Sequence, residues 1–232
     1  NSLPNKDLLA TKVKDLNLYD DDHIKNDKKI EYLKEVEEVA LEKKEIINTE
    51  SDFTESKSNF ILASSDGFLN GYKSSFFSAS CVAVAKNTND QMERDYAFES
   101  RVHINDLPSP SSVGLLSGQR AAARIGARKP PTGNYPIVYD ERVASSLVGH
   151  FINAINGNSI VRGSSWLREN LGDEIFPKNI SIKEFPLKAR CSGSRPFDAE
   201  GLKTYPKSIV NNGVLETWLL DLSSSKNLGL QS

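Results

Sequence analysis

The spacing of apolar residues in the first half of the chain predicts one helix followed by an antiparallel sheet. Over residues 27–44 apolar side chains return every three or four positions, as on one face of a helix, and Asp27 could cap its first turn. Over residues 53–104 apolar and polar positions alternate instead, and turn-forming residues such as Asn87-Thr88-Asn89-Asp90 interrupt the alternation. We therefore expect a meander of antiparallel strands between Phe53 and Ile104.

The second half alternates between helical and strand-like patterns. The patterns predict a helix over 112–128, a strand over 135–139, a helix over 140–156 and short strands over 180–185 and 214–220. The second helix would be capped by Asp140 and closed by Gly157. An antiparallel run followed by mixed helices and strands is typical of an α+β fold, here an antiparallel β-sheet with amphipathic helices.

The same patterns divide the chain into two regions. We predict that residues 1–110 are part of an N-terminal α+β domain, made of a charged helix and then the β-meander. Residues 111–232 would form a central α+β region that leads into a missing C-terminal β-rich domain. The chain begins without Met and its last residues carry no tail-like composition, so we expect it to be truncated at both ends.

Composition describes an ordinary globular protein. The 232 residues are 38% hydrophobic and 26% charged, and the formal net charge is −2. This near-neutral balance does not favour direct contact with nucleic acid. No apolar run approaches the ~18 residues of a membrane span, so we expect no membrane contact. The two cysteines, Cys81 and Cys191, are expected to be reduced thiols of a cytoplasmic protein.

Residue chemistry alone predicts no catalytic residue and no metal site. The three histidines, His23, His103 and His150, lie too far apart in sequence for two of them to bind zinc from one helical turn. His150 follows Gly149 on the second predicted helix, where the plainer interpretation is a partly buried histidine bonded to a carbonyl. Asp198 and Glu200, beside Gly201, could bind a cation, although such residues more often cap a turn. No serine-hydrolase elbow or phosphate-binding loop occurs.

Several runs of residues together resemble the PmbA (TldE-type) branch of the TldD/PmbA metalloprotease family, also known as modulators of DNA gyrase. Their order and spacing match over nearly the whole chain. The runs are Met92-Glu93-Arg94-Asp95-Tyr96, Thr132-Gly133-Asn134-Tyr135-Pro136-Ile137-Val138, Leu147-Val148-Gly149-His150, Arg162-Gly163-Ser164-Ser165-Trp166-Leu167, Ser194-Arg195-Pro196-Phe197-Asp198-Ala199-Glu200-Gly201 and Gly213-Val214-Leu215-Glu216-Thr217-Trp218.

This resemblance implies a cytoplasmic protease of two kinds of subunit. The TldD-type subunit carries His-Glu-x-x-x-His on a helix, with the zinc and the general base. Here Ser145 and Ser146 stand at the positions of the first His and the Glu, and only His150 is kept. The resemblance therefore implies a non-catalytic subunit with no cofactor of its own, a TldD-type partner that carries zinc, and a peptide substrate. Ser145, Ser146, His150, Asp198 and Glu200 are the expected cleft positions.

Two other functions stay open from the sequence. The family's name suggests a non-enzymatic regulator of DNA gyrase or of its toxin inhibitors, and the near-neutral charge would then favour a protein target. A truncated remnant without function is the third hypothesis, because strands without neighbours would expose their edges.

Overall fold

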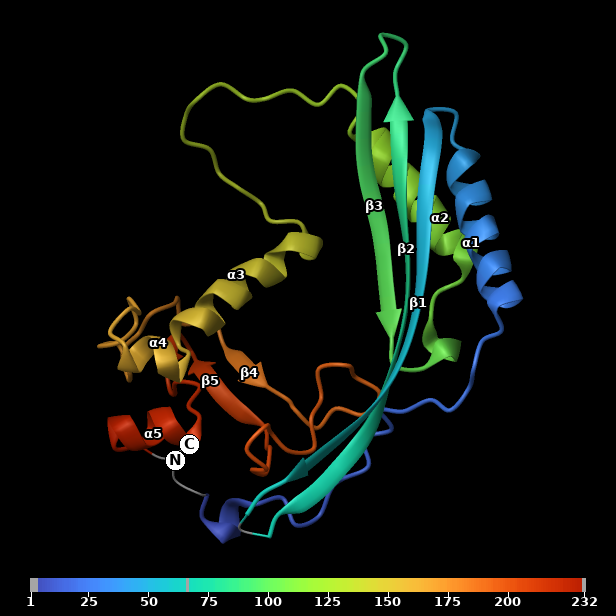
Figure 1. Cartoon of the computed structure of the whole chain (residues 1–232). Coiled ribbons are helices and arrows are strands. Elements are labelled where there is room, and N and C mark those ends of the chain that lie inside the picture. The colour runs from blue at the N-terminus through green and yellow to red at the C-terminus, as the bar shows by residue number, and fades with distance from the viewer. Residues whose placement is uncertain (1–3, 66, 231–232) are drawn as a thin grey trace.

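A long antiparallel sheet runs through the molecule (Figure 1). The structure is a computed structural model that describes residues 4–65 and 67–230. β1 (Ile46–Ala63), β2 (Leu69–Lys86) and β3 (Met92–Arg101) follow one another in the order β1-β2-β3, each antiparallel to the next. This arrangement confirms the meander that the alternating pattern predicted, and with it the α+β fold.

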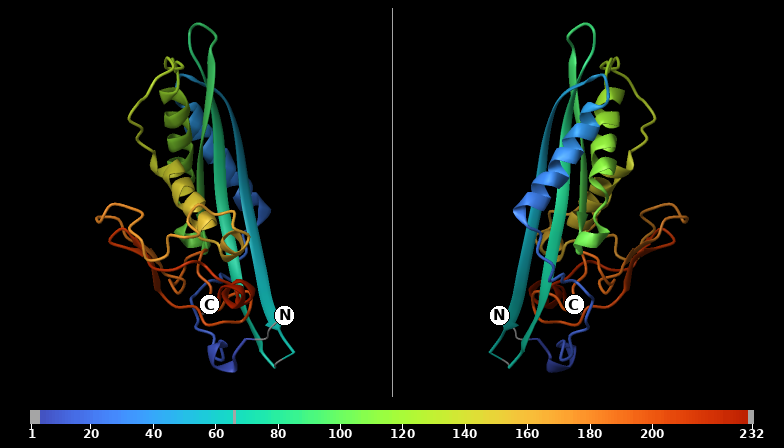
Figure 2. Two further views of the ribbon diagram at one scale, coloured as in Figure 1. Left: turned by 90° about the vertical axis from the view of Figure 1, so that its left-hand side faces the viewer. Right: turned by 90° about the vertical axis from the view of Figure 1, so that its right-hand side faces the viewer.

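Two helices cover one face of this sheet (Figure 2). They are α1 (Asn26–Leu41) and α2 (Pro110–Ala123). Cys81 and Ala97 from the strands are buried with Val36 of α1 and Val113 of α2. α2 can approach α1 closely because it carries a glycine there: a Cβ on Gly114 would lie 2.2 Å from the carbonyl oxygen of Val36.

The start of α1 differs from the prediction. Lys25 precedes the helix and makes no side-chain cap, so the prediction that Asp27 caps the first turn is wrong. Asp27 lies within the first turn instead, where its negative charge interacts favourably with the positive end of the helix dipole. α2, by contrast, begins with a capping side chain, since Ser109 accepts a hydrogen bond from the backbone N–H of Ser112.

The helices and strands from Glu141 onward form a second, smaller unit. It contains α3 (Glu141–Ala154), α4 (Gly157–Val161), α5 (Leu222–Leu228) and a sheet of the order β4-β5-β6. The strands are β4 (Ile182–Glu184), β5 (Lys207–Asn211) and β6 (Val214–Leu215), so the strands predicted over 180–185 and 214–220 are shorter than expected. The core of this unit consists of Phe151, Ala154, Ile155, Leu167, Ile209, Val210 and Leu215.

The far end of the β1–β2 hairpin joins the two units. There Phe60 and Tyr72 of the hairpin contact Phe197, with ring centroids 5.9 and 5.5 Å from it. Phe68 at the hairpin turn packs edge-on against the same ring. Short 3-10 helices lie at Lys6–Leu8 and Ile104–Asp106. Within residues 4–65 and 67–230, no helix is long and apolar enough to cross a membrane.

The segment between α2 and α3 is an extended arm without regular structure, visible as the long arc in Figure 1. The strand predicted over 135–139 is therefore wrong. Among the described residues, nothing pairs with its backbone: residues 128–139 make no backbone–backbone hydrogen bond. A strand needs a neighbour, and the described part of the chain does not supply one.

Candidate functional site

α3 carries three of the five expected cleft positions, and its own sequence fixes where it begins. The Asp140 carboxylate caps the helix by accepting a hydrogen bond from the Arg142 backbone N–H at 3.1 Å, as predicted. That bond, together with the Arg142 guanidinium, holds the pKa of Asp140 below its ordinary value. Of the helical residues only Phe151 and Ala154 are buried, so α3 is attached to the second unit by its last turn.

Ser145, Ser146 and His150 all lie exposed on α3. The Ser146 hydroxyl donates to the backbone carbonyl of Val143 at 2.6 Å, one turn earlier. His150 is exposed and not partly buried as the plainer interpretation of the sequence expected.

This set of side chains does not fit a zinc ion. Zinc in proteins is held by imidazole, thiolate or carboxylate groups, usually three or four of them. Ser145 and Ser146 offer hydroxyls, and His150 offers the one imidazole. Among residues 4–65 and 67–230, no three His, Cys, Asp or Glu side chains are grouped so that they could hold a metal.

The first turn of α3 is tied to the large sheet through Asp95 on β3. The Asp95 carboxylate, only 8% exposed, receives a hydrogen bond from Arg142 at 2.8 Å and lies 3.8 Å from Arg124 at the end of α2. Burial alone would raise the pKa of Asp95, but the Arg142 hydrogen bond and the two positive charges outweigh it and lower that pKa. One carboxylate thus fixes both ends of the arm between α2 and α3.

A groove lies beside the Asp95–Arg142 ion pair, between the start of α3 and β3. Arg142 also stacks over the Tyr96 ring at 5.8 Å from its centroid. Side chains alternate along β3, so Tyr96 and Phe98 lie on the sheet face opposite the buried Ala97 and away from α1 and α2. The groove has a volume of about 380 Å³ and is lined by Tyr96, Phe98, Glu99, Arg120, Glu141 and Arg142.

Asp198 occupies a different place, in a turn of the second unit. One of its carboxylate oxygens accepts hydrogen bonds from the backbone N–H groups of Glu200 and Leu202, both at 2.9 Å. Asp198 therefore organises the turn, as acidic residues beside a glycine often do. It also lines two neighbouring cavities of about 530 and 320 Å³, which share Glu184, Pro186, Asp198 and Thr204.

Glu200 serves as a tether. Its carboxylate accepts a hydrogen bond from the backbone N–H of Leu222 at 2.9 Å, at the first residue of α5. Burial, with the charges of Asp198 and Asp221 nearby, raises the pKa of Glu200 above its ordinary value.

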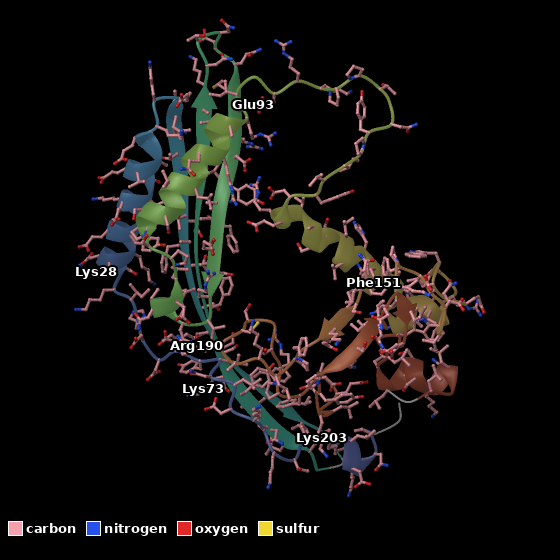
Figure 3. All side chains as sticks on the ribbon, turned by 180° about the vertical axis from the view of Figure 1, so that it is seen from behind. Lys28, Lys73, Glu93, Phe151, Arg190 and Lys203 are labelled. Atoms are coloured by element: carbon pink, nitrogen blue, oxygen red, sulfur yellow. The ribbon has the colours of Figure 1, made fainter. Side chains whose placement is uncertain are left out.

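The structure therefore places the expected cleft positions in two separate groups. In Figure 3, α3 extends from Phe151, which packs in the second unit, toward the large sheet. Among the described residues, no hydrogen bond or ion pair joins Ser145, Ser146 or His150 to the turn of Asp198. The contact that sequence reasoning missed is Asp95 with Arg142, 47 residues apart in the chain.

Comparison with known proteins decides the family. The family profile described as PmbA/TldA metallopeptidase central domain matches residues 19–128, and the one described as PmbA/TldA metallopeptidase C-terminal domain matches residues 132–232. The two matches meet in the arm between α2 and α3. The chain belongs to the PmbA/TldD metallopeptidase family.

Similar proteins support the same family over the whole chain. The chain is 36% identical to Metalloprotease PmbA of Escherichia coli O157:H7 over 229 residues, which are 98% of this chain and 51% of the relative. It is also 36% identical to a Metalloprotease PmbA homolog of Haemophilus influenzae, covering 99% of this chain and 51% of that protein. The chain thus spans about half the length of these curated relatives.

Solved structures share the fold. A protein of Bacteroides thetaiotaomicron described as a modulator of DNA gyrase matches 99% of this chain and 53% of its own, with a TM-score of 0.92 and 29% identity. TldE from Thermococcus kodakarensis matches all of this chain and 54% of its own with a TM-score of 0.67; at 17% identity it supports the fold alone.

Proposed function

We propose that this chain is part of a non-catalytic, PmbA/TldE-type subunit of a cytoplasmic metallopeptidase, and that a TldD-type partner subunit carries the zinc. Its substrate class would be peptides. The chain's own contribution is structural: it presents α3 and the groove beside Tyr96 to the partner and the substrate. No nucleic acid and no membrane are needed for this role.

One observation supports the proposal most directly. At the α3 positions where the family resemblance expects a metal ligand and a general base, this chain has exposed Ser145 and Ser146. A serine hydroxyl binds zinc far more weakly than imidazole, and it cannot act as the carboxylate base that takes a proton from a metal-bound water. The proposal therefore assigns the peptide-cleaving chemistry to a partner chain.

The exposed surface of α3 agrees with a subunit that meets a partner. Val143, Leu147 and Val148 are each close to half exposed on a helix whose last turn alone is buried. Scattered apolar residues are normal on surfaces, but several on one helix beside an open groove are typical of a protein interface.

Co-elution with a TldD-type subunit of the same organism tests the proposal. Both proteins are purified, mixed and separated by size, and hydrolysis of a quenched-fluorescence peptide mixture is measured across the fractions. We expect a shared peak with chelator-sensitive hydrolysis, and no hydrolysis by this chain alone. Hydrolysis by this chain alone, or separate peaks at micromolar concentrations, would contradict it.

A second candidate is a regulator of DNA gyrase without protease activity. It is favoured by the description of the Bacteroides thetaiotaomicron structure as a modulator of DNA gyrase. A gyrase supercoiling assay with and without this chain separates the two. An effect on supercoiling at low micromolar concentration, with no TldD-type subunit present, would favour the regulator.

A further inference from the structure

The arm between α2 and α3 is the most exposed apolar segment in the described chain. All residues from 126 to 140 are exposed. Ile137 is 72% exposed and Val138 is 95% exposed, and Tyr135 and Tyr139 are about half exposed. Residues 128–139 also make no backbone–backbone hydrogen bond within the described chain. Both the apolar side chains and the backbone amides of this segment are free to be covered.

The residues of the arm suit a strand that is covered on both faces. Side chains alternate between the two faces of a strand, so Tyr135, Ile137 and Tyr139 would point to one face and Pro136 and Val138 to the other. Both sets are apolar. A continuous apolar run of β-branched and aromatic residues is typical of a buried strand, whereas an exposed strand has one polar face.

The arm is anchored at both ends. Arg124 and Arg142 both face the buried carboxylate of Asp95. Within the arm, the Tyr135 hydroxyl donates to the carbonyl of Pro131 at 2.9 Å, and three prolines restrict the backbone. An extended segment that is already restricted loses less entropy when a partner strand pairs with it.

We propose that residues 135–139 form a strand that pairs with an extended segment from the half of the family polypeptide that this chain does not span. The relatives from Escherichia coli and Haemophilus influenzae are about twice as long, since this chain covers 51% of each. A second copy of this chain fits less well, because two five-residue strands bury much less than the about 1,200 Å² of a stable interface. This inference does not depend on the proposed protease function.

Pro136 indicates which edge of the arm pairs. In a strand, the backbone groups of alternate residues point to opposite edges, so the amide positions of 136 and 138 share one edge and those of 135, 137 and 139 share the other. Pro136 has no N–H to donate. Continuous pairing therefore uses the edge of Tyr135, Ile137 and Tyr139.

Hydrogen exchange in a chimera tests the pairing. In the chimera this chain replaces the matching 229-residue region of the Escherichia coli relative. Peptides covering residues 134–140 should exchange at nearly the unstructured rate in the 232-residue chain and at least about 100-fold more slowly in the chimera. The turn at residues 87–91 serves as an internal control whose exchange does not change.

Two proline variants of the chimera make the test specific. Ile137→Pro removes an N–H from the pairing edge and should speed exchange at Tyr139 by at least about tenfold, whereas Val138→Pro should have a much smaller effect.

If the chimera does not fold, the same exchange measurement is made on the intact Escherichia coli relative, at the positions aligned with residues 135–139. Fast exchange of this segment in the long protein would overturn the proposal. The proposal would also be overturned if residues 135–139 of the 232-residue chain alone became protected from exchange as the protein concentration rises, since the partner would then be a second copy.

Discussion

The tie between Asp95 and Arg142 makes a quantitative prediction, because it connects α3 to the large sheet through one carboxylate. Asp95→Asn keeps the shape of the side chain and removes its charge. Hydrogen bonds to a charged group contribute about 1.5–3 kcal/mol, and Arg142 keeps a second partner, Asp140, at 3.2 Å. We therefore expect a loss of about 1.5 kcal/mol in the free energy of unfolding, at the lower end of that range.

Urea denaturation of four proteins measures this tie as a pair. They are the natural chain, Asp95→Asn, Arg142→Gln and the double variant, which together give the coupling energy between the two side chains. We expect a coupling of about 1 kcal/mol and faster amide exchange in the first half of α3 in both single variants. Glu31→Gln is the matched control: its pair with Lys28 is well exposed on both sides, so we expect a change below about 0.5 kcal/mol.

The pH dependence follows from the same tie. The pKa of Asp95 is lower in the folded chain than in the unfolded one. Its contribution to stability is therefore fully present above the unfolded pKa of about 3.9 and is lost as the pH falls through the lower folded pKa. The reasoning about this tie would be refuted by a coupling energy between Asp95 and Arg142 below about 0.3 kcal/mol at pH 7, together with unchanged amide exchange in α3. The observed contact between the two side chains would then contribute nothing measurable to stability.

Three further variants concern Gly114 on α2, Gly149 on α3 and Asp20, which precedes α1. Gly114→Ala should destabilise the chain by about 2 kcal/mol or more, because the new Cβ would clash with the Val36 carbonyl oxygen. Gly149→Ala should stabilise the chain by up to about 1 kcal/mol, because no atom lies within 4 Å of the new Cβ and alanine favours a helix. Denaturation midpoints measure both effects. Asp20→Asn should lower stability by about 2 kcal/mol at pH 7. Burial raises the pKa of the Asp20 carboxyl, but the backbone N–H donors of Ile104 and Asp22 outweigh burial and lower it. The difference from the natural chain should therefore begin to shrink below the unfolded pKa of about 3.9 and vanish only once the pH is below the lower folded pKa.

The β-meander was predictable because its pattern is local and long. Alternation over residues 53–104 persists through three strands, and each strand pairs with its neighbour in sequence, so no distant contact is needed. The second predicted helix was likewise located by local signals, since Asp140 caps it as expected. Its end was less well placed: Gly157 begins α4 and does not close α3.

The errors arise where structure depends on distant residues. The run 135–139 has the composition of a strand, yet a strand forms only if another segment supplies hydrogen bonds, and none of the described residues does. His150 was expected to be partly buried, but α3 packs only by its last turn. Asp95 and Arg142 are 47 residues apart, and nothing in either local sequence signals that they meet.

Zinc content is the most direct test of the central claim that this chain does not carry the catalytic metal. The complex with a TldD-type subunit is purified with the natural chain and, separately, with His150→Ala, and the metal is measured by mass spectrometry alongside peptide hydrolysis. We predict about one zinc per TldD-type subunit in both complexes, equal hydrolysis, and no stoichiometric zinc on this chain alone. Zinc bound tightly by this chain alone, or zinc and hydrolysis both lost with His150→Ala, would contradict the account.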